Sequence, residues 1–117
     1  MNIIISRLDY NNSLGKNMRE GSYACLPALT DINAIEDVNQ VKSINIYFDT
    51  KIEAEELAAK FPKSYKAKVH TVGQMSGVTV YCVHFNFATF WKNNVTGSLN
   101  ETAINNRLKV IAKIKSL

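Results

Sequence analysis

The chain has 117 residues, of which 46% are hydrophobic and 21% charged, the balance of an ordinary globular domain rather than of a disordered or fibrous protein. This length can bury one core without disulfides or metals, so we expect a single domain over residues 1–117. The N-terminal apolar run is only Ile3, Ile4 and Ile5, too short for a signal-peptide core or a spanning helix, and we expect a cytoplasmic protein with no membrane contact.

Charge is unevenly distributed along the chain. Residues 63–117 contain eight Lys and Arg residues against one acid, whereas residues 1–40 contain three basic and five acidic residues. Such a basic half either attracts nucleic acid or an acidic protein surface, or serves only as a solubilising face. The thirteen Asn residues, together with many Lys and Ile, are typical of AT-rich codons and hint at a bacterial, phage or plasmid genome.

The N-terminal third predicts short elements. The β-branched start of residues 2–8 favours a strand, and residues 9–15 form a cluster of turn-favouring residues. Residues 16–29 are expected to be irregular, or to hold a short strand around 23–26. Ile32, Ile35 and Val38 recur every three residues behind Thr30 and Asp31, which indicates a capped short helix or a 3₁₀ turn.

The middle of the chain gives sharper patterns. Residues 43–48 alternate between apolar and polar positions, as a half-buried strand does. Thr50 and Glu53 fit a capping box, and the stripe that follows predicts a helix that Pro62 ends. The stripe consists of Ala54, Leu57, Ala58 and Phe61.

The last part predicts a hairpin and a second helix. Residues 65–72 alternate again, residues 73–77 read as a hairpin loop, and residues 78–87 are rich in β-branched and aromatic side chains. Ser98 and Glu101 form a second capping box. The helix after it carries an apolar stripe, widened by Ala112, at Ile104, Leu108, Ile111 and Lys115.

The element order β-[short α]-β-α-β-β-α predicts an α+β fold, with a mainly antiparallel sheet and two helices on one face. We expect a ferredoxin-like variant that lacks the last strand, with the N-terminal strand filling the empty edge. The right-handed crossover rule makes strands 43–48 and 65–72 parallel if they share the sheet.

Motifs for catalysis and metal binding are weak. Cys82 and His84 share one face of a strand and could join His70 as zinc ligands, with Cys25 as a further candidate, but no CxxC or HxxxH spacing supports them. Cys82 with His84 is also the best candidate for a nucleophile and base, although a thiol in an apolar strand is usually inert. We therefore expect no metal, no cofactor and no enzymatic activity.

Nucleic acid is one candidate partner. If Ile44, Ile46 and Phe48 face the helices, the opposite face carries Tyr47, with Lys66, Lys68 and His70 as expected neighbours. Tyr81 is a further candidate for this face, although the orientation of Tyr81 and Phe85 stays open. Aromatic rings between lysines on an open sheet suit single-stranded bases. Residues 77–85 lie where an RNA-recognition motif has its longer signature, but lack that signature's basic start and Gly/aromatic pattern. Residues 54–58 and 65–67 resemble the core of peptidoglycan-binding SPOR modules; neither family is adopted.

A protein partner is the preferred hypothesis. Phe85, Phe87, Phe90 and Trp91 lie within seven residues, more aromatic surface than one strand end normally buries. We expect a stoichiometric, non-catalytic binding protein, resembling phage or mobile-element accessory proteins such as anti-CRISPR inhibitors, that acts on a protein or nucleoprotein complex of the host. A homodimer is an open alternative. The expected contact residues are Phe90, Trp91, Arg107, Lys109 and Lys113.

Overall fold

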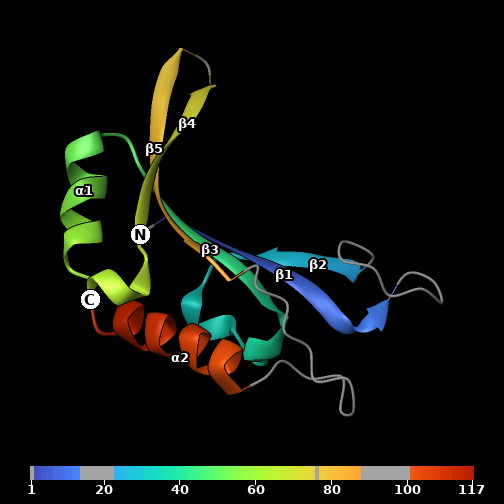
Figure 1. Ribbon diagram of the computed structural model, residues 1–117. Helices are drawn as coiled ribbons and strands as arrows, with labels where there is room; N and C mark the ends of the chain where they lie inside the picture. The colour runs from blue at the N-terminus through green and yellow to red at the C-terminus, as the bar shows by residue number, and fades with distance from the viewer. Residues whose placement is uncertain (1, 14–22, 76, 88–100) are drawn as a thin grey trace.

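The computed structural model describes residues 2–13, 23–75, 77–87 and 101–117 (Figure 1). An open five-stranded sheet, in which every neighbouring pair is antiparallel, has the strand order β2-β1-β3-β5-β4. The strands are β1 (Asn2–Ser13), β2 (Tyr23–Leu29), β3 (Val41–Phe48), β4 (Lys68–Met75) and β5 (Val78–Asn86). The helices are α1 (Lys51–Ala59) and α2 (Glu101–Lys115), with 3₁₀ turns η1 (Ile32–Ala34), η2 (Val38–Gln40) and η3 (Lys63–Tyr65).

β3 is the centre of the sheet, and its alternation is the one that the sequence predicts. Ile44 and Ile46 are fully buried. Ile44 lies between Ile5 on β1 and Phe85 on β5, and Ile46 lies between Ile3 and Val83, so that apolar pairs continue across three strands. These side chains form one face of the sheet, and that face belongs to the core.

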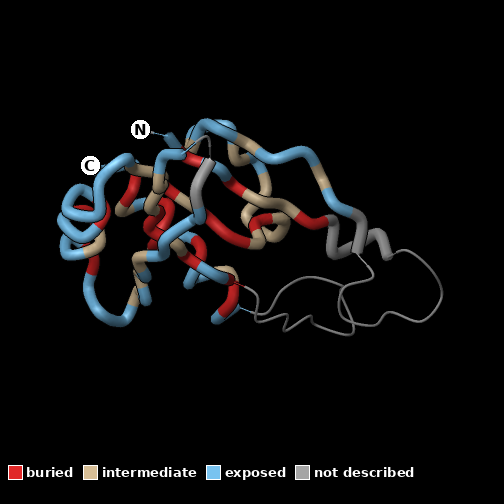
Figure 2. Tube along the Cα trace, turned by 90° about the horizontal axis from the view of Figure 1, so that it is seen from above, coloured by how far each residue is buried: buried red, intermediate tan, exposed pale blue. Residues whose placement is uncertain are grey.

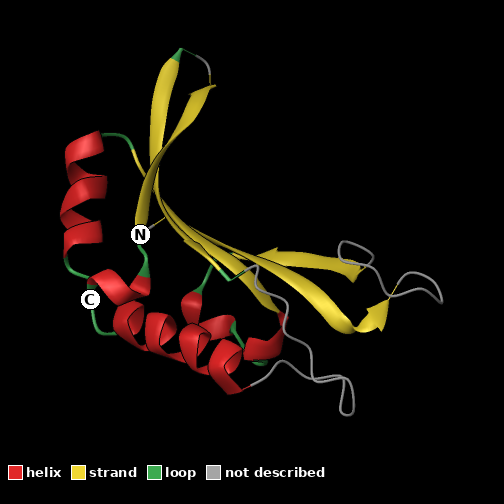
Figure 3. Ribbon diagram, in the orientation of Figure 1, coloured by secondary structure: helices red, strands yellow, loops and turns green. Residues whose placement is uncertain are grey.

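Both helices cover the same face of the sheet (Figure 3). The core cluster contains Ala54, Leu57 and Phe61 from the α1 segment and Val110, Ile111 and Ile114 from α2, together with the apolar sheet residues. Figure 2 shows the buried positions gathered between the layers. The α+β class and the antiparallel sheet are thus confirmed, and within the described ranges no helix lies over the opposite face of the sheet (Figure 1).

α1 begins and ends as the sequence predicts. The Thr50 hydroxyl accepts a hydrogen bond from the Glu53 backbone N–H at 3.3 Å and donates one to the Glu53 carboxylate at 2.9 Å. The helix then ends at Ala59, three residues before Pro62, and Phe61 packs edge-on against Phe85 with ring centroids 4.8 Å apart. Among the described residues, neither helix has the length and apolar character needed to cross a membrane.

Several predicted boundaries were wrong. β1 continues through residues 9–13, which we expected to form a turn, and β2 runs on through Pro27 to Leu29. β4 begins at Lys68 rather than at Tyr65, because residues 63–65 form a 3₁₀ turn that ends at Lys66 in the left-handed conformation. A 3₁₀ turn does occur in the predicted segment 30–38, where the Asp31 side chain caps η1.

The buried stripe of α2 is offset from the predicted one. Ala103, Arg107, Val110, Ile111 and Ile114 are buried, whereas Leu108 is 46% exposed. Ile111 is buried as predicted, but Leu108 and Lys115 are exposed, and the prediction wrongly counted Arg107 as a surface residue. The expected capping residue Ser98 lies outside the described residues.

Candidate functional site

The uncovered face of the sheet presents cross-strand rows of mostly polar side chains. Since successive side chains of a strand alternate between faces, the partners of Asn45 and Tyr47 lie on the face opposite Ile44 and Ile46. We call this surface the open face. Its rows, given by the strand register, are Ser6–Ser43–Asn86, Ile4–Asn45–His84–Lys68 and Asn2–Tyr47–Cys82–His70.

Two histidines meet at the centre of the open face. The rings of His70 and His84 lie edge to face, with centroids 5.2 Å apart and planes at 88°. Nδ1 of His84 contacts Oδ1 of Asn45, so this nitrogen carries the proton that the amide oxygen accepts. Burial lowers the pKa of His84 from its usual 6.5, and the nearby His70 and Lys68 lower it further. His84 is therefore neutral at neutral pH.

Cys82 and Tyr47 are adjacent on the same face. Burial raises the pKa of the Cys82 thiol, an effect that a hydrogen bond from the His70 backbone opposes only in part. Burial, with the neighbouring Cys82, also raises the pKa of Tyr47. A thiol with a raised pKa holds little thiolate, which is the reactive form. Within the described ranges no group of three or more His, Cys, Asp and Glu side chains could hold a metal ion.

The structure brings together three of the five residues expected to bind nucleic acid. Tyr47, Lys68 and His70 all lie on the open face. Tyr81, whose face the sequence left open, pairs with Phe48 and packs against the core cluster, so it does not join Tyr47 on the open face. Lys66 precedes β4 and lines a pocket near α2 instead.

Of the five residues expected to bind a protein partner, three lie in α2 within the described part of the chain. Arg107 is only 1% exposed, so its assignment to a basic contact face was wrong. Lys109 lies over the Tyr65 ring with Nζ 4.9 Å from the centroid, and Lys113 is half-buried one turn later. Phe90 and Trp91 lie outside the described residues.

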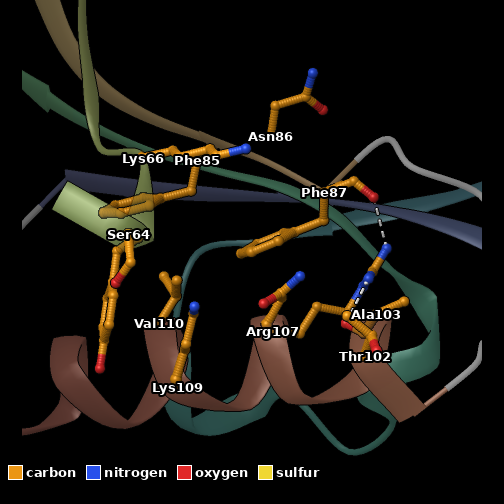
Figure 4. Close-up of a pocket in the computed structure, with 12 residues that line it drawn as sticks. Ser64, Lys66, Phe85, Asn86, Phe87, Thr102, Ala103, Arg107, Lys109 and Val110 are labelled. Carbon is orange, nitrogen blue, oxygen red and sulfur yellow. Dashed lines mark hydrogen bonds between the residues drawn. The ribbon is translucent and has the colours of Figure 1, made fainter. Parts of the chain in front are cut away.

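A pocket lies on the helix side of the sheet, between η3, the end of β5 and α2 (Figure 4). Its volume is about 400 Å³. In Figure 4 the rings of Phe85 in β5 and of Phe87 just after it lie on the α2 side of the sheet, and Lys109 and Val110 extend toward them from α2. No local sequence pattern predicts this pocket, because its walls come from three segments that are separate in the chain.

The open face also contains residues that the sequence analysis did not combine. Asn45 and His84 pair directly across β3 and β5 and share the face of Tyr47. Alternation along β3 was enough to place Asn45 there, whereas the side of β5 that His84 occupies follows only from the strand register. A search against protein-family models, curated proteins and solved structures gives no match to this chain.

Proposed function

We propose that the protein is a non-catalytic binding protein whose open face binds single-stranded nucleic acid. The observation that carries the proposal is the continuity of the open face: rows of polar and ring-bearing side chains cross β1, β3, β5 and β4, and neither of the described helices lies over them. None of the residues in these rows is an Asp or Glu, so nothing in the rows repels a phosphate.

The side chains of this face suit unpaired bases. Tyr47 is half-buried and His70 is exposed, and both offer ring surface on which a base can stack. The side-chain amide of Asn45 contacts His84. The exposed Asn2 lies at the β1 end of the row that contains Tyr47, where its amide group can hydrogen-bond a base. Lys68 lies at the end of the neighbouring row, and its ammonium group is the proposed contact to the backbone phosphate.

The experiment is a binding titration of fluorescently labelled single-stranded DNA and RNA, about ten nucleotides long, followed by anisotropy at low salt. We expect Tyr47→Ala and His70→Ala each to weaken binding by about 1–3 kcal/mol, the usual contribution of one base stacked on a ring. Lys68→Gln should reduce the slope of log affinity against log salt by about 0.7, the effect of losing one phosphate contact on a single strand.

The matched control is Thr71→Ala. Thr71 follows His70 on β4, is also exposed, and pairs with Tyr81 on the opposite face of the sheet. Its replacement should leave the affinity unchanged. Absence of binding to every oligonucleotide at low salt, or an equal loss for Thr71→Ala and His70→Ala, would refute the proposal.

A protein or nucleoprotein complex of a host is the second candidate partner, with the protein as a stoichiometric inhibitor of phage or mobile-element origin. Lys109 and Lys113 favour it, because they lie one turn apart on α2 and can meet an acidic surface. A pull-down with and without nuclease separates the candidates. A partner lost on nuclease treatment supports the open face, and one that survives it supports the helix.

Two structural features support two further parts of the proposal, the non-catalytic role and the ferredoxin-like topology. The raised pKa of Cys82 weakens its candidacy as a nucleophile, which favours binding over catalysis. The order β3-β5-β4, with β1 on the other side of β3, is consistent with a ferredoxin-like variant in which the N-terminal strand occupies the place of the missing last strand. We offer this topology as part of the proposal.

A further inference from the structure

We propose that the pocket between η3, the end of β5 and α2 is a binding site for a small organic anion with an aromatic body, such as an aromatic carboxylate. The pocket lies on the helix side of the sheet, against α2 (Figure 4). The inference does not depend on the nucleic-acid proposal, and either can fail alone.

The inner wall of the pocket is apolar and aromatic. Phe85 and Val110 are each 1% exposed and Phe87 is 8% exposed, so these side chains are held in place by the core. Tyr65 adds a ring beside Lys109. A rigid aromatic wall favours a planar apolar ligand, because aromatic rings attract one another in offset or edge-to-face packing.

The rim and interior of the pocket are positively charged. Lys66, Arg107 and Lys109 line it, and none of its lining residues is an Asp or Glu. Nζ of Lys109 is held 4.9 Å from the centre of the Tyr65 ring, which fixes the ammonium at the wall. A cavity lined by one sign of charge within low-dielectric walls concentrates the opposite sign, and this pocket therefore selects an anion.

The backbone at Lys66 gives an independent indication. Its φ is 54°, and among the described residues it is the one non-glycine with a positive φ. Glycine or asparagine would fit this position with less strain than lysine. Strained positions of this kind gather at ligand sites, and Lys66 lies at the rim of this pocket.

The size and the remaining polar groups agree with a small ligand. A volume of about 400 Å³ falls in the range of small-molecule sites. Ser64, Thr102 and Asn106 line the pocket and supply hydroxyl and amide groups that can orient the anionic group. An apolar wall with a few convergent polar and cationic groups is the usual composition of such a site.

The test uses 2-naphthoate as the probe and its neutral analogue 2-naphthamide as the comparison, both titrated into the ¹⁵N-labelled full chain and followed by NMR. We expect 2-naphthoate to shift the backbone amides of Lys66, Asn106 and Lys109, and to bind at least about fivefold more tightly than 2-naphthamide, because two lysines line the pocket and attract a carboxylate. Lys66→Gln and Lys109→Gln should each weaken 2-naphthoate by about threefold or more and leave 2-naphthamide unchanged.

Lys113→Gln is the matched control, since Lys113 lies one turn beyond Lys109 on α2 but does not line the pocket. It should bind 2-naphthoate as the unchanged chain does. Equal affinity for the acid and the amide, shifts confined to the open face, or no binding at millimolar concentration would each overturn the proposal. The comparison of 2-naphthoate with 2-naphthamide uses only the unchanged chain, so its result holds even if a substitution disturbs the fold.

Discussion

The guanidinium of Arg107 joins three separate parts of the chain. It donates hydrogen bonds of 2.8 Å to the carbonyl oxygens of Val41 at the start of β3, Phe87 just beyond β5 and Ala103 in α2. The guanidinium carbon also lies 5.2 Å from the centre of the Phe87 ring. A charged group buried in this way is stable only because carbonyl oxygens replace the water that it loses. Arg107 is therefore a structural residue that ties α2 to the sheet.

Replacing Arg107 by Met tests this role. Met keeps most of the apolar volume but removes the donors, so three buried carbonyl groups lose a hydrogen bond from a charged partner. We expect the free energy of unfolding to fall by about 3 kcal/mol, measured by urea denaturation. Lys113→Met, on the same helix, should change it by no more than about 0.5 kcal/mol. Equal stability of Arg107→Met and the unchanged chain would show that the hydrogen bonds contribute nothing net.

His84 should make stability depend on pH. Its pKa is lowered in the folded chain, chiefly by burial and then by His70 and Lys68, so the unfolded chain takes up the proton more readily. The stabilising contribution is fully present above the unfolded pKa of about 6.5 and is lost as pH falls through the folded pKa. We expect the free energy of unfolding to decrease from about pH 7 to about pH 5, with a smaller decrease in His84→Gln.

Urea denaturation at stepped pH values measures this dependence. Lys68→Gln is a useful companion variant, because removing one of the charges that lower the pKa of His84 should reduce the slope only in part. Identical slopes for the unchanged chain and His84→Gln would contradict the assignment.

At the scale of the elements, the start of α1 is determined by residues that are close together in the sequence. Its start depends on Thr50 and Glu53, which are three residues apart and hydrogen-bond each other. Replacing Thr50 by Ala should lower the free energy of unfolding by about 1 kcal/mol, because the Glu53 N–H loses its acceptor. Thr50→Ser keeps the hydroxyl and should retain most of that stability, and denaturation of both variants checks the difference. An equal loss for Ala and Ser would mean that the cap is not what stabilises this end.

In β5, by contrast, the local sequence pattern does not determine which side chains face the helices. Buried side chains occur on both of its faces, since Cys82 is 4% exposed on the open face and Val83 is fully buried on the other. A strand buried on both faces loses the alternation that distinguishes inside from outside. Only pairing with β3 fixes the face of Tyr81, and that pairing joins residues more than thirty positions apart. The face of Tyr81 was therefore beyond what the sequence could decide.

At the scale of the whole molecule, the class of fold was predictable and the sites were only partly so. The strand at residues 43–48 and the helix after Thr50 follow from periodicity and capping, which are local properties. Arg107 was misplaced because a charged residue in an apolar stripe is usually at the surface. The pocket requires three segments to meet, and Lys66 reaches it only because η3 replaces the start of the predicted strand.

The two outer strands of the sheet each contain an irregularity. In β2 the ring of Pro27 removes a donor, and its carbonyl already accepts hydrogen bonds of 2.9 and 2.8 Å from Arg7. In β4 the register shifts between Thr71 and Gln74, where Gly73 has a φ of 48°. A second copy of the chain that approaches either edge strand meets an interrupted row of backbone hydrogen-bonding groups. This interruption hinders edge-to-edge pairing of two sheets. In the described part of the chain, a sheet face without a helix over it is thus combined with outer strands that are poor templates for pairing with a further strand.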